Sequence, residues 1–408
     1  MAPARHVIVA GAGIAGLTAA LALSRAGLRA TVLEQSPALQ ETGAGIQLSP
    51  NATRVLIVLG LRERLAGAVT TPQAIRVMNG GSGREIARIP LGSEAERRYG
   101  APYWTIHRGD LQAALAAAVE ADQDTAIKLG IRVEDFAAHV NGVSVLGRHG
   151  QKTIIEERGI ALVGADGIWS NVGERLGGRR APAFAHRTAW RALVPAEAVP
   201  AEFRAPFVHL WLGLDAHLVH YPVKGGRTIN IVGIVCDEWN GTDWSAAGDR
   251  DEMLRHYARF TWCEAARALV ALPERWLKWA LYERRAPFSG GEGPVTLIGD
   301  AAHPMLPFLG QGGGMAIEDA VVLTDRLARG VDNPTEALRE YERARLNRTS
   351  RAQQMSRKQG RIYGLTGPEA LIRNIGMRLL GNERLLARQD WLYSWQPPEP
   401  FQIKSVLT

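Results

Sequence analysis

Three glycines and one acidic residue near the N-terminus have the types and the spacing that dinucleotide binding requires. Gly11, Gly13 and Gly16 form a G-x-G-x-x-G sequence directly after an apolar run. Gly11 permits a tight turn, Gly13 lets a pyrophosphate approach the backbone, and Gly16 allows a helix to pack closely on a strand. About 20 residues later, Glu34 can accept hydrogen bonds from ribose hydroxyls. This acid favours an unphosphorylated ribose, as in FAD or NAD, over that of NADP.

A second glycine-rich stretch, GDAAHPMLPFLGQGGGMAIEDA, occupies residues 299–320. It places Asp300 at the end of an apolar run and a cluster of glycines where a helix should begin. Glycines at a helix N-terminus leave backbone N–H groups open to a ligand that lies close to the chain. A third turn, GADG at residues 164–167, also follows an apolar run. Such turns are common α/β connectors, so it is their occurrence together that indicates a nucleotide site.

The pattern of apolar residues predicts the elements that carry these turns. Residues 6–10 read as a buried strand, residues 14–26 as a helix that ends at Gly27, and residues 29–34 as a second strand. Further apolar strands begin near residues 159 and 295. The chain therefore predicts an α/β fold with a Rossmann-like βαβ unit at its N-terminus.

These motifs, taken in order, resemble those of the class A flavoprotein aromatic hydroxylases, the superfamily of p-hydroxybenzoate hydroxylase. GAGIAG, GADGIWS and GDAAHP match its three ordered motifs, and HRGDL adds a matching arginine, from about residue 5 to about residue 350. The resemblance is closest to the branch of salicylate, hydroxybenzoate and 6-hydroxynicotinate monooxygenases. One departure is visible: relatives commonly place an arginine just after the S-x-V that follows the DG turn. Here Gly173 stands there, and the nearest arginine is Arg175.

The resemblance implies FAD as the cofactor and NADH or NADPH as the co-substrate. It also implies which positions contact FAD. They are Gly11, Gly13, Ala15, Gly16, Glu34, Gly45, Arg108, Asp166, Asp300, Pro307, Gly312, Gly313, Gly314 and Met315.

The resemblance further implies a discontinuous FAD-binding domain, made of residues 1–72, 100–180 and 286–345. Residues 73–99 and 181–285 contain alternating strand-like stretches and are expected to form an inserted, mostly antiparallel substrate domain. Residues 346–408 are expected to form a C-terminal helical segment.

The activity that the resemblance implies is hydroxylation of a phenolic or heteroaromatic acid. In such enzymes NAD(P)H reduces FAD, and a flavin C4a-hydroperoxide then delivers one oxygen atom of O2 to the ring. A phenol is best attacked as its phenolate, which calls for a base. On a strand, His217 and Tyr221 would share one face, and the resemblance makes His217 the base and Tyr221 a ligand of the substrate. A shift of one residue would instead present His220.

Three further residues are expected to line the substrate site. The resemblance places Gln47 in one wall, and Pro307 with Phe308 in an apolar wall near the flavin. Arg191 could attract a carboxylate, but a packing or exposed role is favoured for it. His303 is expected to be structural.

The preferred substrate is salicylate-like, with loss of carbon dioxide as one outcome. The alternative is a 3-hydroxybenzoate- or 6-hydroxynicotinate-type hydroxylase that does not decarboxylate its substrate. A flavin halogenase is disfavoured, because its W-x-W-x-I-P motif is absent and TAWRALVP does not match it. The alternative from another class is a non-catalytic binding protein with a nucleotide-type fold.

Composition narrows the class of protein further. The 408 residues carry a formal charge of +7, but the arginines are scattered and no nucleic-acid motif is present, so no nucleic-acid partner is expected. Cys236 and Cys263 are too few for a disulfide framework or a metal cluster, and they favour a reducing compartment. The sequence thus predicts a cytoplasmic monomer or homodimer without a metal site or a membrane partner.

Overall fold

A computed structural model describes residues 5–39, 44–150, 153–177, 180–241, 243–258, 262–284, 288 and 290–402. Its first layer is a five-stranded sheet in which every pair of neighbours is parallel. In sheet order the strands are β18 (Val295–Leu297), β11 (Ala161–Gly164), β1 (His6–Ala10), β2 (Arg29–Glu34) and β7 (Thr125–Leu129).

Helix α1 (Ile14–Arg25) joins β1 to β2 and packs against α9 (Gly312–Arg329). Positive φ angles at Gly11 and Gly27 bound this unit, as the turn and the helix end require. A Cβ at Gly16 would lie 1.9 Å from the carbonyl oxygen of Gly11, so only glycine fits at this helix–strand contact. The predicted βαβ unit is confirmed.

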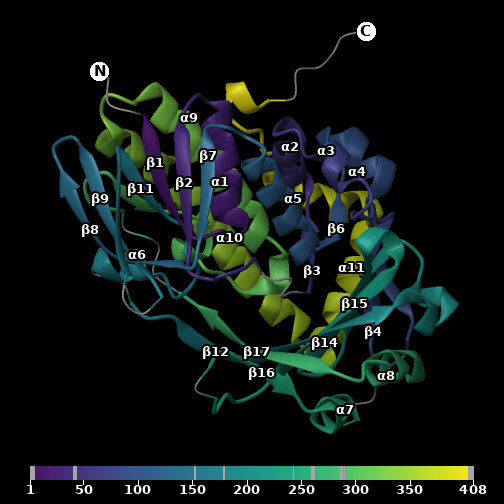
Figure 1. The fold of residues 1–408 in the computed structure, drawn as a ribbon. Coiled ribbons are helices and arrows are strands. Elements are labelled where there is room, and N and C mark those ends of the chain that lie inside the picture. The colour runs from purple at the N-terminus through teal and green to yellow at the C-terminus, as the bar shows by residue number, and fades with distance from the viewer. Residues whose placement is uncertain are drawn as a thin grey trace.

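The second layer is an eight-stranded sheet that is antiparallel except where β4 and β13 pair in parallel. Figure 1 shows it apart from the parallel sheet, with α10 (Pro334–Tyr363) running through the region between them. Its order is β16 (Ser245–Gly248), β17 (Trp276–Glu283), β12 (Ala183–Pro195), β15 (Thr228–Cys236), β14 (Ala216–Val223), β13 (Phe207–Leu212), β4 (Ala74–Asn79) and β5 (Glu85–Pro90).

Smaller elements complete the fold. A two-stranded sheet pairs β3 (Gly45–Leu48) with β6 (Trp104–His107), and a three-stranded sheet contains β8 (Ile131–His139), β9 (Gly142–His149) and β10 (Thr153–Gly159). The other helices are α2 (Pro50–Val58), α3 (Arg62–Leu65), α4 (Gly92–Tyr99), α5 (Arg108–Glu120), α6 (Asn171–Arg175), α7 (Arg250–Ala258), α8 (Glu264–Ala271), α11 (Gly367–Ala387) and α12 (Asp390–Tyr393). Short 3-10 turns cover 196–198, 201–203, 224–226, 299–301, 307–309 and 399–401.

The predicted fold class is confirmed: a Rossmann-like sheet, a mostly antiparallel sheet between its segments, and helices toward the C-terminus. The assignment of domain limits remains a prediction. Among the described residues, no helix is both long and apolar enough to cross a membrane.

A buried ion network ties α9 to α10. Asp319 and Glu318 are fully buried, and Arg345 of α10 pairs with both, with nitrogen–oxygen distances of 2.7 and 2.8 Å. Asp319 also accepts a hydrogen bond from the backbone N–H of Gly299, 2.9 Å away, and contacts Nε2 of His303 at 2.5 Å. Burial works to raise the pKa of Asp319, but His303 and Arg345 lower it to about 2. The carboxylate is therefore ionised, and it fixes the turn that carries Asp300.

Three buried histidines make the stability of the fold sensitive to acid. Burial lowers the pKa of His209 to about 4 and of His217 to about 3, and that of His220 far below its usual value. At pH 5 the unfolded chain binds protons at these positions while the folded chain does not. The three histidines therefore contribute their full stability to the fold above the unfolded-state pKa of about 6.5. This contribution is lost as pH falls toward 4.

We expect the free energy of unfolding of the FAD-free protein, measured with urea, to fall by about 2 kcal/mol per buried histidine between pH 7 and pH 5. The His217→Ala variant removes one of the three groups, so its unfolding free energy should depend less steeply on pH. An equal pH dependence in the two proteins would contradict this assignment.

Candidate active site

A cavity of about 910 Å³ lies between one face of the eight-stranded sheet, the loop that leads into α9, the C-terminal end of α10, and α11. It brings together residues that are far apart in the sequence. Gln47 comes from β3, His217 from β14 and Phe308 from the loop, while Tyr363 ends α10. This volume is at the upper end of the range for pockets that bind small organic ligands, about 300 to 1,000 Å³.

The alternation of β14 puts His217, Val219 and Tyr221 on the face of the sheet that lines this cavity. His220 points to the opposite face, where it is fully buried and stacks on His209 with ring centroids 4.4 Å apart. Nδ1 of His220 accepts a hydrogen bond from the indole N–H of Trp211, 3.2 Å away. The register therefore presents His217, and not His220, to the cavity.

His217 lies among aromatic rings. The rings of Phe308 and Tyr363 have centroids 5.5 and 5.3 Å from that of its imidazole. Burial, with a further contribution from the charge of Arg187, lowers the pKa of His217 to about 3. The ring is therefore neutral at pH 7, and a neutral imidazole can accept a proton or a hydrogen bond.

Tyr221 and Gln47 form a polar edge to this otherwise apolar cavity. Burial raises the pKa of Tyr221, while Arg191 and a hydrogen bond with Gln47 act the other way. Oε1 of Gln47 also accepts a hydrogen bond from the hydroxyl of Tyr103, 2.7 Å away. The phenol of Tyr221 thus stays protonated at neutral pH and can donate a hydrogen bond.

The loop before α9 supplies the wall facing these residues. Pro307, Phe308 and Asp300 all line the cavity. Desolvation raises the pKa of Asp300, with the charges of His303 and Arg108 acting the other way. Arg108 and Asp300, distant in sequence, are thus near enough to interact.

Helix α9 begins with backbone donors that no helical carbonyl satisfies. The N–H of Met315 makes the first bond within the helix, to the carbonyl of Gln311 at 2.8 Å. The N–H groups of residues 312–314 therefore precede the first intrahelical bond. Gly312 and Gly313 line the cavity, whereas the side chain of Met315 is buried in the core. The N-terminus of α9 can stabilise a negative charge placed in the cavity.

The N-terminal turn adjoins this loop. A Cβ on Gly299 would lie 3.0 Å from that of Ala15, so α1 and the Gly-Asp turn are in close contact. Both carboxylate oxygens of Glu34 accept backbone hydrogen bonds, from Ala12 at 2.7 Å and from Ser36 at 2.8 Å. Each oxygen has a second lone pair, so Glu34 keeps acceptor capacity for a ligand.

Two other residues expected to contact a cofactor have structural partners as well. Asp166 accepts hydrogen bonds from the hydroxyl of Ser170 and from the N–H of Val172, while burial raises its pKa. The N–H of Gly45 donates to Oδ1 of Asn230 at 2.7 Å. A Cβ on Gly45 would lie 2.7 Å from the ring of Tyr221, so this glycine permits β3 to approach the sheet.

Comparison with known proteins assigns this arrangement to a family. The family model described as the FAD binding domain matches residues 4–356. The chain belongs to this FAD-binding family. It is 36% identical to 3-hydroxybenzoate 6-hydroxylase 1 of Aquipseudomonas alcaligenes, over 97% of this chain and 99% of that one. It is 38% identical to 3-amino-4-hydroxybenzoate 2-monooxygenase of Streptomyces cremeus, over 95% and 94%. A solved salicylate hydroxylase substrate complex superposes with a TM-score of 0.80 at 26% identity, covering 100% of this chain and 99% of that one.

The protein is an FAD-dependent aromatic monooxygenase that uses NADH or NADPH. The described residues fit FAD in a way that can be checked at two glycines. A Cβ on Gly13, at the start of α1, or on Gly313, in the first turn of α9, would meet no atom within 4 Å, whereas a Cβ on the nearby Gly16 or Gly314 would lie less than 3 Å from another atom. The space beside them is therefore available to a ligand. When bound, FAD supplies the redox chemistry that activates O2.

Several lining residues of this flavoprotein were not expected from the sequence. Tyr103, Tyr363 and residues of α11 reach the cavity only because the chain folds back on itself. Arg191 lines the cavity too, and its guanidinium lies 4.1 Å from the ring centroid of Trp279. Burial lowers the pKa of Arg191 to about 10, so it keeps its charge at pH 7. His303, as expected, has a structural partner, Asp319.

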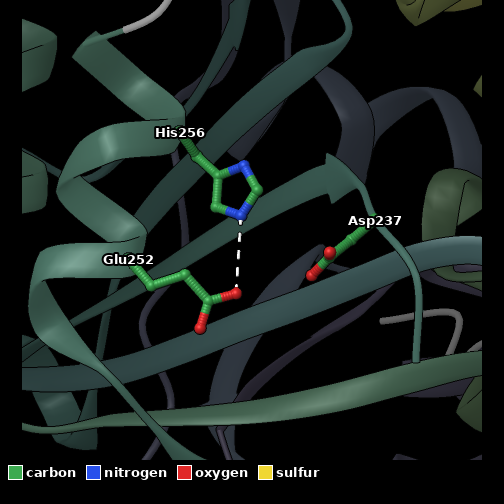
Figure 2. Close-up of side chains that lie close together, drawn as sticks. All are labelled: Asp237, Glu252 and His256. Carbon is green, nitrogen blue, oxygen red and sulfur yellow. Dashed lines mark ion pairs between the residues drawn. The ribbon is translucent and has the colours of Figure 1, made fainter. Parts of the chain in front are cut away.

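A separate cluster of two acidic residues and a histidine lies away from this cavity, on α7 and on the segment that follows β15. Figure 2 shows Asp237, Glu252 and His256 pointing toward one another, and their ligand atoms lie within 4.8 Å of one another. The ammonium of Lys278 lies 2.7 Å from Asp237 and 2.7 Å from Glu252. Because a positive charge already stands between the two carboxylates, the cluster is an ion-pair network of the flavoprotein.

Proposed function

We propose that this monooxygenase hydroxylates a hydroxybenzoate-type acid bound between His217, Tyr221 and the loop at Pro307 and Phe308. The observation that carries the proposal is the largely apolar cavity in which a neutral imidazole and a phenol flank Val219 and face the N-terminus of α9. An aromatic ring with one polar edge suits such a cavity.

In this proposal His217 accepts the proton of the substrate hydroxyl. The loss of that proton raises the electron density of the ring that is attacked. Burial disfavours the imidazolium of His217, but the phenolate formed beside it raises the pKa of the ring again. Tyr221 and Gln47 hold a polar group of the substrate, and Pro307 with Phe308 excludes water. NAD(P)H supplies two electrons, one oxygen atom of O2 enters the ring, and the other leaves as water.

The cavity also suits a carboxylate. The charge of Arg187 acts on His217, and that of Arg191 acts on Tyr221, so both proposed substrate contacts lie in a positive field. The similarity to the 3-hydroxybenzoate and 3-amino-4-hydroxybenzoate enzymes favours a hydroxybenzoate that keeps its carboxylate. The salicylate-like reading, with loss of carbon dioxide, is the second candidate, and the similarity to salicylate hydroxylase favours it.

A substrate panel tests both candidates. The purified holoenzyme is mixed with NADH or NADPH and with 3-hydroxybenzoate, salicylate or 6-hydroxynicotinate, and oxidation of the nucleotide and product mass are measured. We expect 3-hydroxybenzoate to stimulate oxidation most and to gain 16 mass units without loss of carbon dioxide. A product that has lost carbon dioxide would favour the salicylate-like candidate, and no product with any acid would contradict the proposal.

We further infer that the enzyme acts in the cytoplasm as a monomer or a homodimer. Cys236 and Cys263 are free thiols, and Cys236 is exposed. Exposed thiols are typical of proteins in reducing compartments, which supports the cytoplasm.

A further inference from the structure

The cavity extends well beyond the space between His217 and Tyr221. The register of the eight-stranded sheet places one row of cavity-lining side chains across six strands. Because neighbouring strands lie about 4.8 Å apart, this row continues roughly 14 Å from Val219 toward the β5 edge of the sheet. In strand order the row is Ala87, Val77, Leu210, Val219, Val232 and Arg191.

The two ends of this row differ in character. Arg191 carries a charge at one end, whereas at the other end the lining side chains of β4 and β5 are all apolar and are covered by α11. Met377 and Leu380 of α11 pack toward Val77, Ala87 and Leu210 in one hydrophobic cluster. We call the space lined by these five residues the apolar gallery.

A glycine of α11 faces the gallery where a larger side chain would be accommodated. Gly376 lines the cavity, and a Cβ built there would meet no atom within 4 Å. A glycine inside a helix makes the helix less stable than most other residues would. The absence of a side chain at Gly376 therefore lowers helix stability but keeps the gallery open. Arg373, one turn before, fixes this part of α11 by donating to the carbonyls of Ile362 and Tyr363 at 3.0 and 3.1 Å.

We propose that the apolar gallery is a substrate subsite that holds an apolar substituent of the ring, so that the enzyme accepts phenolic acids carrying an alkyl or aryl group. The inference rests on the proposed function, because the acid must bind between His217 and Tyr221 for its substituent to enter the gallery. An unsubstituted hydroxybenzoate leaves the gallery to water, which an apolar lining binds poorly. A substituent removes the apolar lining from water, and this burial is favourable.

The test measures equilibrium binding to the holoenzyme in the absence of a reductant, and the change in flavin absorbance is the signal. The ligands are 3-hydroxybenzoate and its ethyl, butyl and hexyl derivatives at the 4 or 5 position. We expect the dissociation constant to fall roughly fourfold for each added methylene until the gallery is filled, in one of the two positional series.

Two phenylalanine variants on the same helix make the test specific. Gly376→Phe fills the gallery, and it should weaken binding of the butyl derivative at least tenfold while leaving the parent acid within about twofold. Leu379→Phe is the matched control, since Leu379 is 79% exposed and does not line the cavity. Gly376→Leu repeats the test with a smaller side chain.

The outcomes separate this inference from the proposed function. Dissociation constants that stay level or rise with chain length, in an enzyme that turns over the parent acid, would overturn the gallery alone. Chain-length-dependent binding that Gly376→Phe abolishes, without turnover of any acid, would support the gallery and overturn the proposed function.

Discussion

A Gly13→Val variant is expected to fold with nearly unchanged stability and yet to bind FAD at least 100-fold more weakly. Gly13 has a φ angle of −75°, which any residue can adopt, and a Cβ there meets no protein atom within 4 Å. A Cβ at Gly13 would therefore displace no atom of the described residues, but it would displace a ligand that lies close to the backbone. The FAD-free variant should unfold within about 1 kcal/mol of the parent protein, the size of a change at a helix N-cap.

Gly16→Ala is the informative comparison for this experiment. Its Cβ would lie 1.9 Å from the carbonyl oxygen of Gly11, so the turn itself must shift whether or not FAD is present. We expect the FAD-free Gly16→Ala protein to lose about 3 kcal/mol or more of unfolding free energy, as overpacked sites do. Flavin absorbance after reconstitution and urea unfolding of the FAD-free proteins measure the two effects. Full FAD affinity in Gly13→Val would contradict the position given to the pyrophosphate.

The second large effect is expected from His217→Ala. If His217 accepts the phenol proton, turnover should fall by about 10² to 10⁴, the usual contribution of a general base. FAD content should not change, because His217 is on β14 and the residues expected to bind FAD are elsewhere. The rate of product formation per flavin, measured at saturating substrate, reports the loss.

The pH profile distinguishes a base from a packing residue. The pKa of His217 is about 3, so the parent enzyme should not change in rate through titration of this group between pH 6 and pH 9. In the variant, only substrate molecules that have already lost their phenol proton react well. Its rate should therefore rise about tenfold per pH unit toward the phenol pKa of about 10. His186→Ala is the control, because His186 is exposed and outside the cavity. A low but level profile in His217→Ala would assign His217 a packing role.

The local parts of this architecture could be predicted from the sequence. The strand at residues 6–10 and the strand at residues 29–34 have the predicted bounds. Their limits are set by apolar runs and glycine turns, which are local features of the sequence. The common face of His217 and Tyr221 could also be predicted, since side chains alternate along a strand. The choice between His217 and His220 needed the neighbouring strands, because Trp211 and His209 decide which face is the core.

Long-range contacts set the limit of sequence reasoning. Tyr103 and Tyr363 lie 260 residues apart and carry no motif, yet both reach the cavity. The gallery depends on how β4 pairs with β13 and how α11 covers them, and periodicity within each element does not encode such pairing. The sequence favours a packing or exposed role for Arg191, but β12 places this residue in the lining of the cavity.

The buried network of Asp319 and Arg345 has a consequence for how the enzyme is made. The ribosome delivers Gly11 to Gly16 first, but the turn at Gly299 is fixed by Asp319, and Asp319 is held by Arg345. Most of the chain must therefore be synthesised before both halves of the flavin site exist together. Cofactor loading is thus a late event of biogenesis. A truncated chain that ends before α10 would be unable to retain flavin after its release from the ribosome.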